Sequence, residues 1–229
     1  MMFKADLHIH SYYSDGRASP REIIAYAVAN GLSVISITDH NTFQGSIAAM
    51  KIAPSFKNIM VIPGVEVRTD EGDILVYCYE EFDFPRRLET LLDKARDNNC
   101  LIVPAHPFDV MRLGIGDRVF DFKGWSAIEV WNAGATTGAN RRAVEAARLL
   151  GLPGIANSDA HIVEHIGAAY TLIEAEGLTL PEVFEAVLKG RVKPIQGRYP
   201  FRTMVKRIKW SVEYRIKKLY SRSEPSSET

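Results

Sequence analysis

The chain has 229 residues and a formal net charge of zero, with 46% hydrophobic and 24% charged residues. This length suits one domain of a barrel or layered α/β type, and the composition is ordinary for a soluble globular protein. No apolar run is long enough to span a bilayer, and the first residues lack the apolar segment of a secretory signal. The two cysteines, Cys78 and Cys100, have no CxxC spacing. We therefore expect no disulfide framework and a reducing, cytoplasmic location.

The zero net charge hides an uneven distribution. Residues 198–222 contain nine Lys or Arg and one acid, whereas residues 1–197 contain 19 basic and 25 acidic side chains. We therefore divide the chain into a mildly acidic body (1–197), a basic segment (198–222) and a Ser-rich, charged tail (223–229) that we expect to be disordered.

Short apolar runs alternate with helical patterns through the first half of the chain. A helix is predicted from Ser19 to Gly31, because Ser19 fits the cap, Pro20 the first turn and Glu22 the capping-box acid. A second helix is predicted from about Thr42 to Ala53. The predicted strands are residues 3–10, 34–37, 59–62 with its end at 64–66, and 74–79, the last as a possible second arm of a hairpin.

The second half continues the same alternation. Helices are predicted over residues 85–98, 139–150 and 180–189, and strands over residues 101–103, 128–131, 154–156 and 169–173. Residues 108–124 are less regular and are predicted to be a long loop with a helical turn. Repeating βα units favour a largely parallel sheet, either closed or doubly wound.

The histidines are the most informative residues. Five of the six stand at the end of a predicted strand or directly follow one, namely His8, His10, His40, His106 and His161. The carboxyl ends of parallel strands open onto one face of the sheet, where active sites form. We therefore expect these five side chains, distant in sequence, to converge.

The first strand carries an alternating Asp6-x-His8-x-His10 pattern. Because side chains alternate along a strand, these three share a face, and the two histidines can chelate one ion. Zn²⁺, Mn²⁺ and Fe²⁺ all accept imidazole together with carboxylate. Asp6 is then either a ligand or a partner that orients an imidazole. Taken alone, the pair would equally fit two structural histidines.

Other acids and histidines close the remaining strands: Asp39 and His40, then Glu66, then His106, and finally Asp159 and His161. Each has a structural alternative when taken singly, with Asp39 as a helix cap, Glu66 as a surface acid and His106 as a loop residue. All of them at strand ends predict one metal centre, in which Glu66 can bridge two ions.

Together these motifs resemble the PHP (polymerase and histidinol phosphatase) family, over residues 3 to about 195. The matching motifs are Asp6-Leu7-His8-Ile9-His10-Ser11, Ser14-Asp15-Gly16, Thr38-Asp39-His40-Asn41, Gly64-Val65-Glu66, Ala105-His106-Pro107 and Asn157-Ser158-Asp159-Ala160-His161. The resemblance implies an α/β fold of the distorted (β/α)7 TIM-like barrel type, here with an additional C-terminal basic helix. It also implies two or three metal ions at the C-terminal face of the barrel and the hydrolysis of phosphoesters.

The resemblance sorts the metal ligands into three positions. One ion would be held by His8, His10, Glu66 and Asp159; a second would share Glu66 and take His106; a third would take Asp15, His40 and His161. Asp73 stands where many members have a further histidine. It would either replace that ligand, since carboxylates bind the same metals, or be a turn residue beside a weaker second site. The ligand types do not distinguish Mn, Zn and Fe.

The implied reaction is hydrolysis of a phosphate ester by a metal-bound hydroxide, with Glu66, Asp159 and His161 as catalytic residues. His161 or a metal-bound water is the candidate proton donor. Members of this size with an acid at position 15 resemble small-molecule phosphoesterases that act on nucleotides. Histidinol phosphate, short oligonucleotides and other phosphomonoesters also stay open. Candidate substrate contacts, each of which also has a purely structural explanation, are Arg17, Arg68, Arg112, Asn132 and Arg141.

The basic segment has the pattern of an amphipathic helix. Val205, Ile208, Val212, Ile216 and Leu219 recur at spacings of three and four, which places them on one helix face, and Lys or Arg side chains crowd the rest. Such a helix can lie on an anionic membrane or contact nucleic acid. We favour instead a terminal helix that packs this stripe on the barrel and leaves its lysines in solvent.

Two other functions compete with the phosphoesterase. One is an amidohydrolase-like metal hydrolase that cleaves a non-phosphate substrate, and the other is a non-catalytic module that binds metal or nucleic acid. The retention of Asp15, Glu66, Asp159 and five histidines argues against the second, because a binding module need not keep them. The sequence makes no prediction of the oligomeric state.

Overall fold

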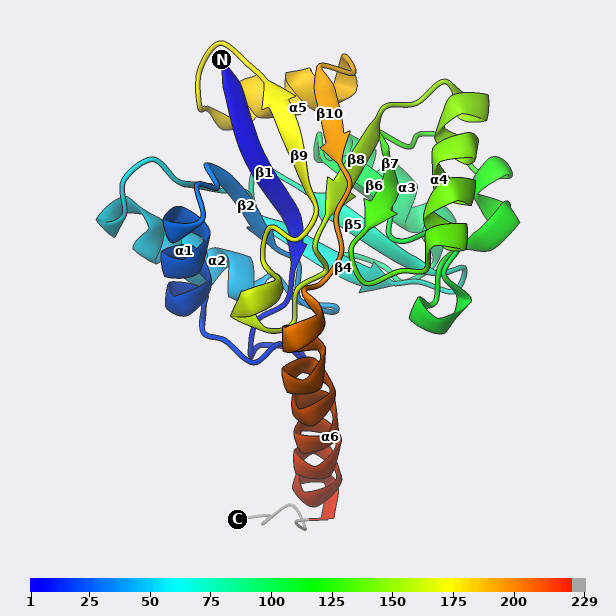
Figure 1. Ribbon diagram of the computed structural model, residues 1–229. Helices are drawn as coiled ribbons and strands as arrows, with labels where there is room; N and C mark the ends of the chain where they lie inside the picture. Colours follow the sequence, from blue (N-terminus) through cyan, green and yellow to red (C-terminus); the bar gives the residue numbers. More distant parts are fainter. Residues whose placement is uncertain (224–229) are drawn as a thin grey trace.

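The computed structural model describes residues 1–223, whose strands and helices form a mixed α/β body with one projecting helix (Figure 1). The strands are β1 (Met2–Ile9), β2 (Val34–Ile37), β3 (Met60–Val61), β4 (Gly64–Arg68), β5 (Asp73–Tyr77), β6 (Leu101–Pro104), β7 (Ile128–Asn132), β8 (Gly154–Asn157), β9 (Tyr170–Glu174) and β10 (Val192–Ile195). The α-helices are α1 (Pro20–Ala29), α2 (Gln44–Ile52), α3 (Leu88–Asp97), α4 (Thr137–Leu150), α5 (Leu180–Leu188) and α6 (Phe201–Ser223).

The largest sheet has the strand order β10-β9-β1-β2-β3. β1, β2 and β3 run parallel, whereas β9 is antiparallel to both β1 and β10. Helix α1 packs on this sheet through Ile23, Ile24 and Ala27, which are fully buried. Burying one such isoleucine contributes about 1.5–3 kcal/mol. The predicted capping box is confirmed, since Ser19 and Glu22 cap each other's backbone N–H at the start of α1.

The remaining strands form a three-stranded sheet, β4-β5-β6, and a two-stranded sheet, β7-β8. The first of these is antiparallel throughout. The hairpin predicted with residues 74–79 as its second arm is therefore confirmed, whereas the prediction of a largely parallel sheet is wrong here. The predicted third strand also divides into β3 and β4, which belong to different sheets. Pro63 lies between them and has no backbone N–H to donate, which explains why the ladder breaks at this point.

The three sheets surround a common interior without joining into one. β6 lies beside β7, β8 lies beside β10, and β2 lies beside β4, so the sheet edges adjoin one another. Over residues 1–223, however, hydrogen bonds leave three separate sheets, and the expected closed seven-stranded barrel is not confirmed. What the strands do share is the placement of their carboxyl ends, which decides the position of the site described below.

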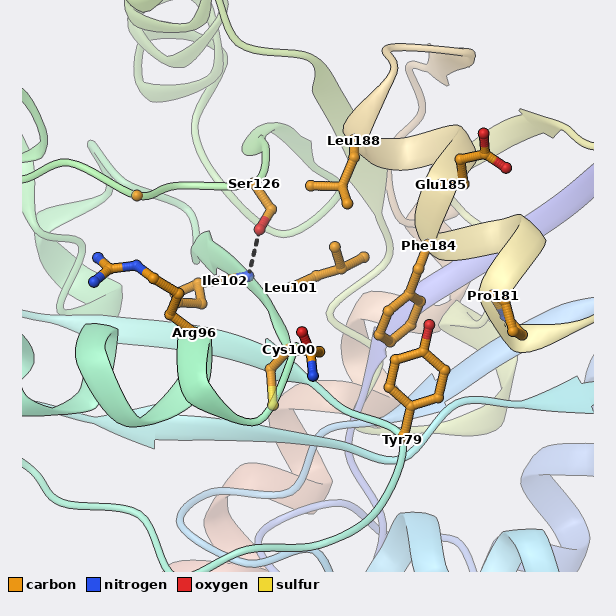
Figure 2. A pocket seen from close by; sticks show the side chains of 12 residues that line it. Tyr79, Arg96, Cys100, Leu101, Ile102, Ser126, Pro181, Phe184, Glu185 and Leu188 are labelled. Carbon is orange, nitrogen blue, oxygen red and sulfur yellow. Dashed lines mark hydrogen bonds between the residues drawn. The ribbon is translucent and has the colours of Figure 1, made fainter.

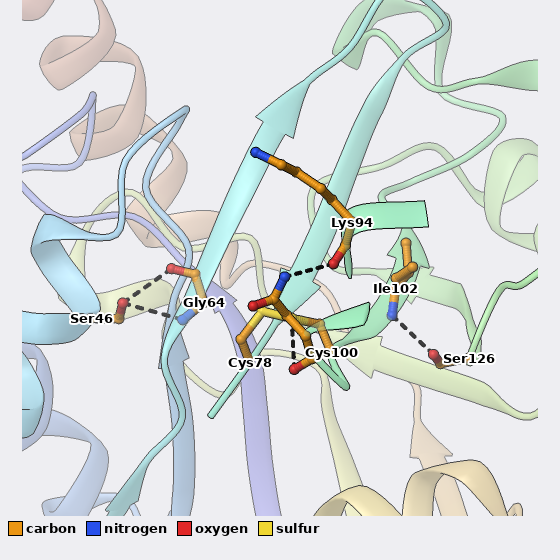
Figure 3. The surroundings of a disulfide bond; sticks show 8 residues. Ser46, Gly64, Cys78, Lys94, Cys100, Ile102 and Ser126 are labelled. Carbon is orange, nitrogen blue, oxygen red and sulfur yellow. Dashed lines mark hydrogen bonds between the residues drawn. A yellow bond between two sulfur atoms is a disulfide. The ribbon is translucent and has the colours of Figure 1, made fainter. Parts of the chain in front are cut away.

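Cys78 and Cys100 form a disulfide bond, so the prediction of unpaired cysteines is wrong (Figure 3). Cys78 follows β5 and Cys100 precedes β6, and these strands pair antiparallel with Tyr77 opposite Leu101. The next position out on each strand therefore brings the two Cα atoms to 4.3 Å. The cysteines consequently no longer support a reducing compartment, and the cytoplasmic location stays a prediction.

Helix α6 is the predicted basic helix, but the face that packs on the body is the opposite of the one that we expected to be buried. Figure 1 shows it projecting from the body, near the carboxyl end of β1. The aliphatic stripe faces solvent, with exposed fractions between 47% for Ile216 and 70% for Val205. Trp210, on the other face, is 8% exposed and packs towards the body. No helix in the described part of the chain is both long and apolar enough to cross a membrane. The predicted tail, apart from Ser223, lies outside the described residues.

Candidate metal centre

The predicted ligands meet at the carboxyl ends of strands from all three sheets. His8 and His10 lie at the end of β1, His40 follows β2, Glu66 lies in β4, His106 follows β6, and Asp159 and His161 follow β8. Two isolated parallel bridges hold the strand ends together, one between Ile9 and Ala160 and the other between His40 and Glu66. The convergence of the five histidines is therefore confirmed.

Glu66 occupies the middle of the cluster and is almost fully buried. Its Oε2 lies 3.4 Å from His8 Nε2, 3.3 Å from His10 Nε2 and 3.0 Å from His40 Nδ1. Its Oε1 lies 3.1 Å from His106 Nε2. Although three ring nitrogens surround Oε2, neither it nor His40 Nδ1 has a hydrogen-bond partner among the described residues. A carboxylate oxygen in this position fits a site for a shared cation.

Two further carboxylates complete the cluster from other sides. Asp159 Oδ1 lies 3.3 Å from His10 Nε2 and 3.6 Å from His8 Nε2. Asp15 Oδ2 lies 3.3 Å from His161 Nε2, and its Oδ1 lies 3.7 Å from both His10 Nδ1 and His40 Nε2. Asp15 is therefore brought to the imidazoles, although it lies in a loop and not at the end of a strand.

The donor atoms fall into four overlapping groups, in each of which all atoms lie within 4.8 Å of one another. The groups are His8, His10 and Asp159; His8, Glu66 and His106; His40, Glu66 and Asp73; and His10, Asp15, His40 and His161. Imidazole nitrogens mixed with carboxylate oxygens suit Zn²⁺, Mn²⁺ or Fe²⁺. The donor set therefore fits several divalent cations, and Asp73 faces the same cluster.

Asp73 is shared between this cluster and Arg68. The Arg68 guanidinium donates two hydrogen bonds of 3.1 Å to its two carboxylate oxygens. Burial and the neighbouring Glu66 raise the pKa of Asp73, while Arg68 lowers it. A buried acid held by one exposed arginine keeps oxygen lone pairs for another cation, so the geometry is compatible with a ligand at this position.

The electrostatic balance of the cluster depends on its positive groups. Burial alone would raise the pKa of Glu66, but His40, His8 and the hydrogen bond from His106 hold it well below the ordinary value. Burial likewise opposes ionisation of Asp159, and the charge of Arg112 is the largest influence that lowers its pKa. Both carboxylates are therefore ionised, which is the form that binds metal ions.

Two of the candidate ligands have strained backbones. His106 has a φ of 31° and Asp159 a φ of 55°, in the left-handed region that non-glycine residues seldom adopt. Such a residue costs on the order of 1–3 kcal/mol and persists where its surroundings fix it. At His106 the constraint is visible, because its backbone N–H donates to Glu129 Oε2 at 2.6 Å.

Glu129 is a residue of the site that sequence analysis missed. It lies near the start of β7, fully buried, and its Oε1 accepts a hydrogen bond of 3.0 Å from His8 Nδ1. Glu129, Glu66 and Asp159 raise the pKa of His8, which burial alone would lower. When a cation displaces the Nε2 proton, the bond to Glu129 keeps the remaining proton on Nδ1 and leaves the lone pair of Nε2 for the cation. Asn132 and Asn157 donate to the other lone pairs of Glu129. The one available signal was an acid inside an apolar strand, Ile128-Glu129-Val130, which requires a buried partner.

Two acids from the predicted motifs lie behind the centre. Asp6 accepts hydrogen bonds from the backbone N–H groups of Ser158 and Gly167, so it ties β1 to the segment after β8. Asp39 accepts from the N–H and hydroxyl of Ser11 and from the Ser14 hydroxyl. It therefore fixes the loop that presents Asp15. Neither acid belongs to any of the four donor groups.

A cavity of ≈ 180 Å³ opens onto the cluster. Besides the candidate ligands, it is lined by Arg68, Met111, Arg112, Leu113 and Arg207. Arg112 donates to Asp159 Oδ2 at 2.8 Å and to the carbonyl oxygen of Gly134 at 3.0 Å. Two of the predicted substrate contacts, Arg68 and Arg112, are thus at the cavity, together with Arg207 from α6, which was not predicted.

The other three predicted substrate contacts do not line this cavity. Arg17 lines a separate depression beside Glu22 and Glu164. Arg141 is exposed on α4. Asn132 is fully buried and bonded to Glu129, Asn140 and Gly134, so it supports the centre from behind.

A larger cavity, of ≈ 450 Å³, lies elsewhere (Figure 2). It is lined by residues at the start of β6, such as Leu101 and Ile102, and by α5 side chains that include Phe184 and Leu188. His106 follows the opposite, carboxyl end of β6. Figure 2 shows mainly apolar side chains around this space, with Arg96 and Glu185 at its edges, so it offers no comparable set of metal donors.

The sequence also matches known family models. A model described as the PHP domain matches residues 6–107, and one described as PHP-associated matches residues 137–192. The chain is 35% identical over 143 residues to an uncharacterised protein of Methanocaldococcus jannaschii, and the match covers 57% of this chain and 82% of that protein. The chain belongs to the PHP family. The resemblance carried by the motifs at the strand ends is thereby confirmed.

Two further proteins are more distantly similar to this PHP chain. It is 37% identical over 71 residues, 31% of its length, to the 3′,5′-nucleoside bisphosphate phosphatase of Chromobacterium violaceum, and the match spans 25% of that enzyme. Its structure resembles a two-domain protein of Bacteroides vulgatus that contains a predicted PHP-like metal-dependent phosphoesterase, with a TM-score of 0.72 and 19% identity. This alignment covers 86% of the present chain and 65% of the other, and it supports the fold alone.

Proposed function

We propose that this PHP-family chain hydrolyses a phosphate ester, using two or three divalent cations (Mn, Zn or Fe) held by the metal centre. The observation that carries the proposal is Glu66 Oε2, a buried carboxylate oxygen within 3.0–3.4 Å of three ring nitrogens and without a hydrogen bond. The partial similarity to a nucleoside bisphosphate phosphatase supports a nucleotide or another small phosphomonoester as the substrate.

The ligand sets we propose are those that the family resemblance implies. His8, His10, Glu66 and Asp159 would hold the first cation; Glu66 and His106, with Asp73 as a further ligand, the second; and Asp15, His40 and His161 the third. The donor groups of the structure overlap with these sets but divide them differently, since Asp73 groups with His40 and Glu66, and His106 with His8 and Glu66. His161 Nδ1 lies 3.0 Å from the carbonyl oxygen of Asp159, which can only accept a hydrogen bond. In a neutral His161 ring the proton therefore sits on Nδ1. The lone pair of Nε2, on the side of Asp15, is then available to bind a metal ion. This arrangement favours a ligand role for His161 over the predicted role of proton donor.

The remaining residues of the cavity bind the substrate. Bound cations would activate water, whose pKa falls towards about 7, and would neutralise the phosphoryl group. Arg112 sits beside Asp159 at the cavity wall, and its planar guanidinium matches phosphoryl oxygens in two-point hydrogen bonding. Arg68 contributes a second guanidinium to the lining of the same cavity. Together they orient a phosphate over the carboxylates that would otherwise repel it.

The test combines metal analysis with a phosphate-release screen. The purified chain, loaded in turn with Mn, Zn or Fe, is assayed on nucleotides, bisphosphates and sugar phosphates. Glu66→Gln should lose both bound metal and turnover, because the cluster loses its central charge. Glu71→Gln is the matched control, since Glu71 pairs with Arg118 and does not line the cavity. Full activity of Glu66→Gln would refute the bridging role. Cleavage of amides, with no phosphate release from any loaded form, would favour the amidohydrolase alternative.

A further inference from the structure

Helix α6 is anchored to the rim of the metal centre. Its Trp210 Nε1 donates to the carbonyl oxygen of Asp15 at 2.8 Å, and Lys206 pairs with Glu164 at 2.7 Å. Just before the helix, the Tyr199 hydroxyl lies 2.8 Å from the carbonyl oxygens of Ser158 and Asp159. These contacts join α6 to two segments that carry candidate ligands. The helix therefore forms part of the wall around the site.

A second cavity, of ≈ 340 Å³, adjoins the cavity over the metal centre. The two cavities share Asp15, His40 and Arg68 in their linings. The outer walls of the second one are formed by Tyr13 from the loop after β1 and by Tyr214 and Lys218 from α6. A volume of this size is in the range of sites for small organic ligands, about 300–1,000 Å³.

The side chains of this second cavity differ in chemistry from the metal centre. Tyr13 and Tyr214 contribute aromatic rings to the lining, and Lys218, whose Nζ lies 5.9 Å from the centroid of the Tyr214 ring, and Arg68 add positive charge. Aromatic faces stack on planar nucleobases with little preference for sequence, and cations attract the phosphates that accompany them. A sugar alcohol without a base or a phosphate would use neither the aromatic rings nor the positive charges. The cavity lies beside the centre, where the alcohol portion of a phosphate ester would extend from a bound phosphoryl group.

We propose that α6 builds a leaving-group subsite in which Tyr13, Tyr214 and Lys218 bind the nucleoside portion of a nucleotide-type phosphoester. This inference rests on the proposed phosphoesterase function and deepens it. The nucleobase can belong to a free nucleotide or to the end of a short oligonucleotide, since both present a base next to the phosphoryl group. Tyr214 is here a residue that determines specificity, on a helix apart from the metal ligands.

Kinetics with matched substrates test the subsite in the metal-loaded full chain. Tyr214→Ala should raise KM for AMP about 5- to 100-fold, the range for losing one base–aromatic contact, with kcat nearly unchanged. Its KM for glycerol phosphate should not change. Tyr214→Phe should restore the affinity for AMP. Phe201→Ala is the control, because Phe201 is an aromatic residue on the same helix that is exposed and does not line the cavity.

The outcomes separate this inference from the proposed function. A phosphorylated dinucleotide tested beside AMP decides between a free nucleotide and a chain end. An equal rise in KM for AMP and glycerol phosphate, or no change for AMP, would overturn the subsite. If no phosphoester is hydrolysed, the proposed function fails, and direct binding of AMP to the metal-loaded protein still tests the subsite. A Kd for AMP that is equal in wild type and Tyr214→Ala would then refute it.

The outer face of α6 carries a second and independent observation. Val205, Ile208, Val212, Ile216 and Leu219 form an aliphatic stripe whose members are all at least 47% exposed. Trp210, which anchors the helix to the body, lies on the opposite face. Contiguous apolar surface on a helix marks an interaction site, because isolated exposed aliphatic residues would not recur at helical spacing.

The positive charge around the aliphatic stripe indicates which kind of partner binds to it. Residues 201–223 contain eight Lys or Arg and one acid, and exposed Arg202, Lys209 and Arg215 flank the stripe. A second copy of the chain would bring a helix of the same strong positive charge against the first. An anionic lipid surface instead accepts the apolar stripe and attracts the flanking cations together. We infer that the outer face of α6 docks on anionic membranes.

Vesicle sedimentation with the full chain tests the docking. Vesicles of phosphatidylcholine with phosphatidylserine should bind the protein, phosphatidylcholine alone should not, and high salt should weaken binding. Ile208→Ser combined with Ile216→Ser should lose binding at least about tenfold, since two buried side chains are removed from the interface. Leu149→Ser on α4, an equally exposed leucine, is the control. Binding that is unchanged in the double variant would refute the inference. The inference would also be refuted if the wild-type chain were a dimer in solution and the double variant a monomer, because the stripe would then be the contact with a second copy.

Discussion

Replacing Glu129 by glutamine tests how the site prepares His8 for a metal ion. The Glu129 carboxylate accepts four hydrogen bonds, two on each oxygen. Its Oε1 accepts from His8 Nδ1 at 3.0 Å and Asn157 Nδ2 at 2.9 Å, and its Oε2 accepts from the His106 N–H at 2.6 Å and Asn132 Nδ2 at 3.2 Å. Glutamine replaces the two accepting oxygens by one oxygen and one NH2 group. Because two hydrogen-bond donors point at each of the two positions, the NH2 group faces two donors in either orientation.

The surroundings decide where the glutamine NH2 group can go. Asn157 and Asn132 cannot simply turn over, because their side-chain oxygens accept from the N–H groups of Leu7 and Gly134. The backbone N–H of His106 is fixed. His8 alone can adapt, by moving its proton from Nδ1 to Nε2, which then ceases to be a ligand atom. The folded state loses one charged hydrogen bond, about 1.5–3 kcal/mol, and leaves a buried donor unsatisfied, about 1–3 kcal/mol, so we expect a destabilisation of about 3–5 kcal/mol.

Two measurements on Glu129→Gln separate these effects. Guanidinium unfolding of the metal-free protein gives the stability, and titration with Mn or Zn against a competing chelator gives the affinity. Affinity should fall about 10- to 100-fold, the usual cost of losing a partner that orients a ligand. Glu71→Gln, which removes an ion pair outside the cavity, should change neither quantity appreciably. A destabilised Glu129→Gln with wild-type metal affinity would show that Glu129 supports only the fold.

Three further predictions concern stability, each measured by denaturant unfolding. Reducing the Cys78–Cys100 disulfide, which closes a loop with a sequence separation of 22, should cost about 3 kcal/mol, and a Cys→Ser double variant unfolding at the wild-type midpoint would contradict this. Burial lowers the pKa of His165 from 6.5 to about 4, so the unfolded chain binds the proton first and stability is lost as pH falls from 6.5 to 4. His165→Gln should flatten this slope, and an unchanged slope would assign it to other groups. Ser19→Ala should cost about 1 kcal/mol by removing the capping box, and no change would mean that the start of α1 is held by packing alone.

The site could largely be predicted because its residues are fixed to the ends of strands. A strand places alternate side chains on one face, so the spacing of His8 and His10 assigns them to the same face. His40 could be placed beside them because it follows an apolar run that marks the end of a neighbouring strand. Asp15 lies in a loop, and periodicity says nothing about it. Its position emerged only through the family motif, and in the structure it depends on hydrogen bonds that Asp39 makes to Ser11 and Ser14.

The errors come from features that depend on partners distant in sequence. Strand direction is one, because the patterns of β4, β5 and β6 are compatible with parallel or antiparallel pairing. The disulfide follows from that pairing, since only the antiparallel register puts Cys78 opposite Cys100. Glu129 is another, because an acid inside a strand signals a buried partner without naming it. Each of these residues is locally ordinary and acquires its role from a contact across the fold.

The orientation of α6 shows how such a contact can overrule local reasoning. Periodicity identified two faces, and counting aliphatic residues favoured the one with Val205 and Ile208 as the buried face. The face with Trp210 and Tyr214 is the one that packs, because aromatic side chains bury about 150–250 Å² each and an indole N–H requires an acceptor. The carbonyl oxygen of Asp15 supplies that acceptor at 2.8 Å. The helix is thereby fixed at the metal centre, and its aliphatic face points away from the body, where the anionic membrane that we infer as its partner can reach it.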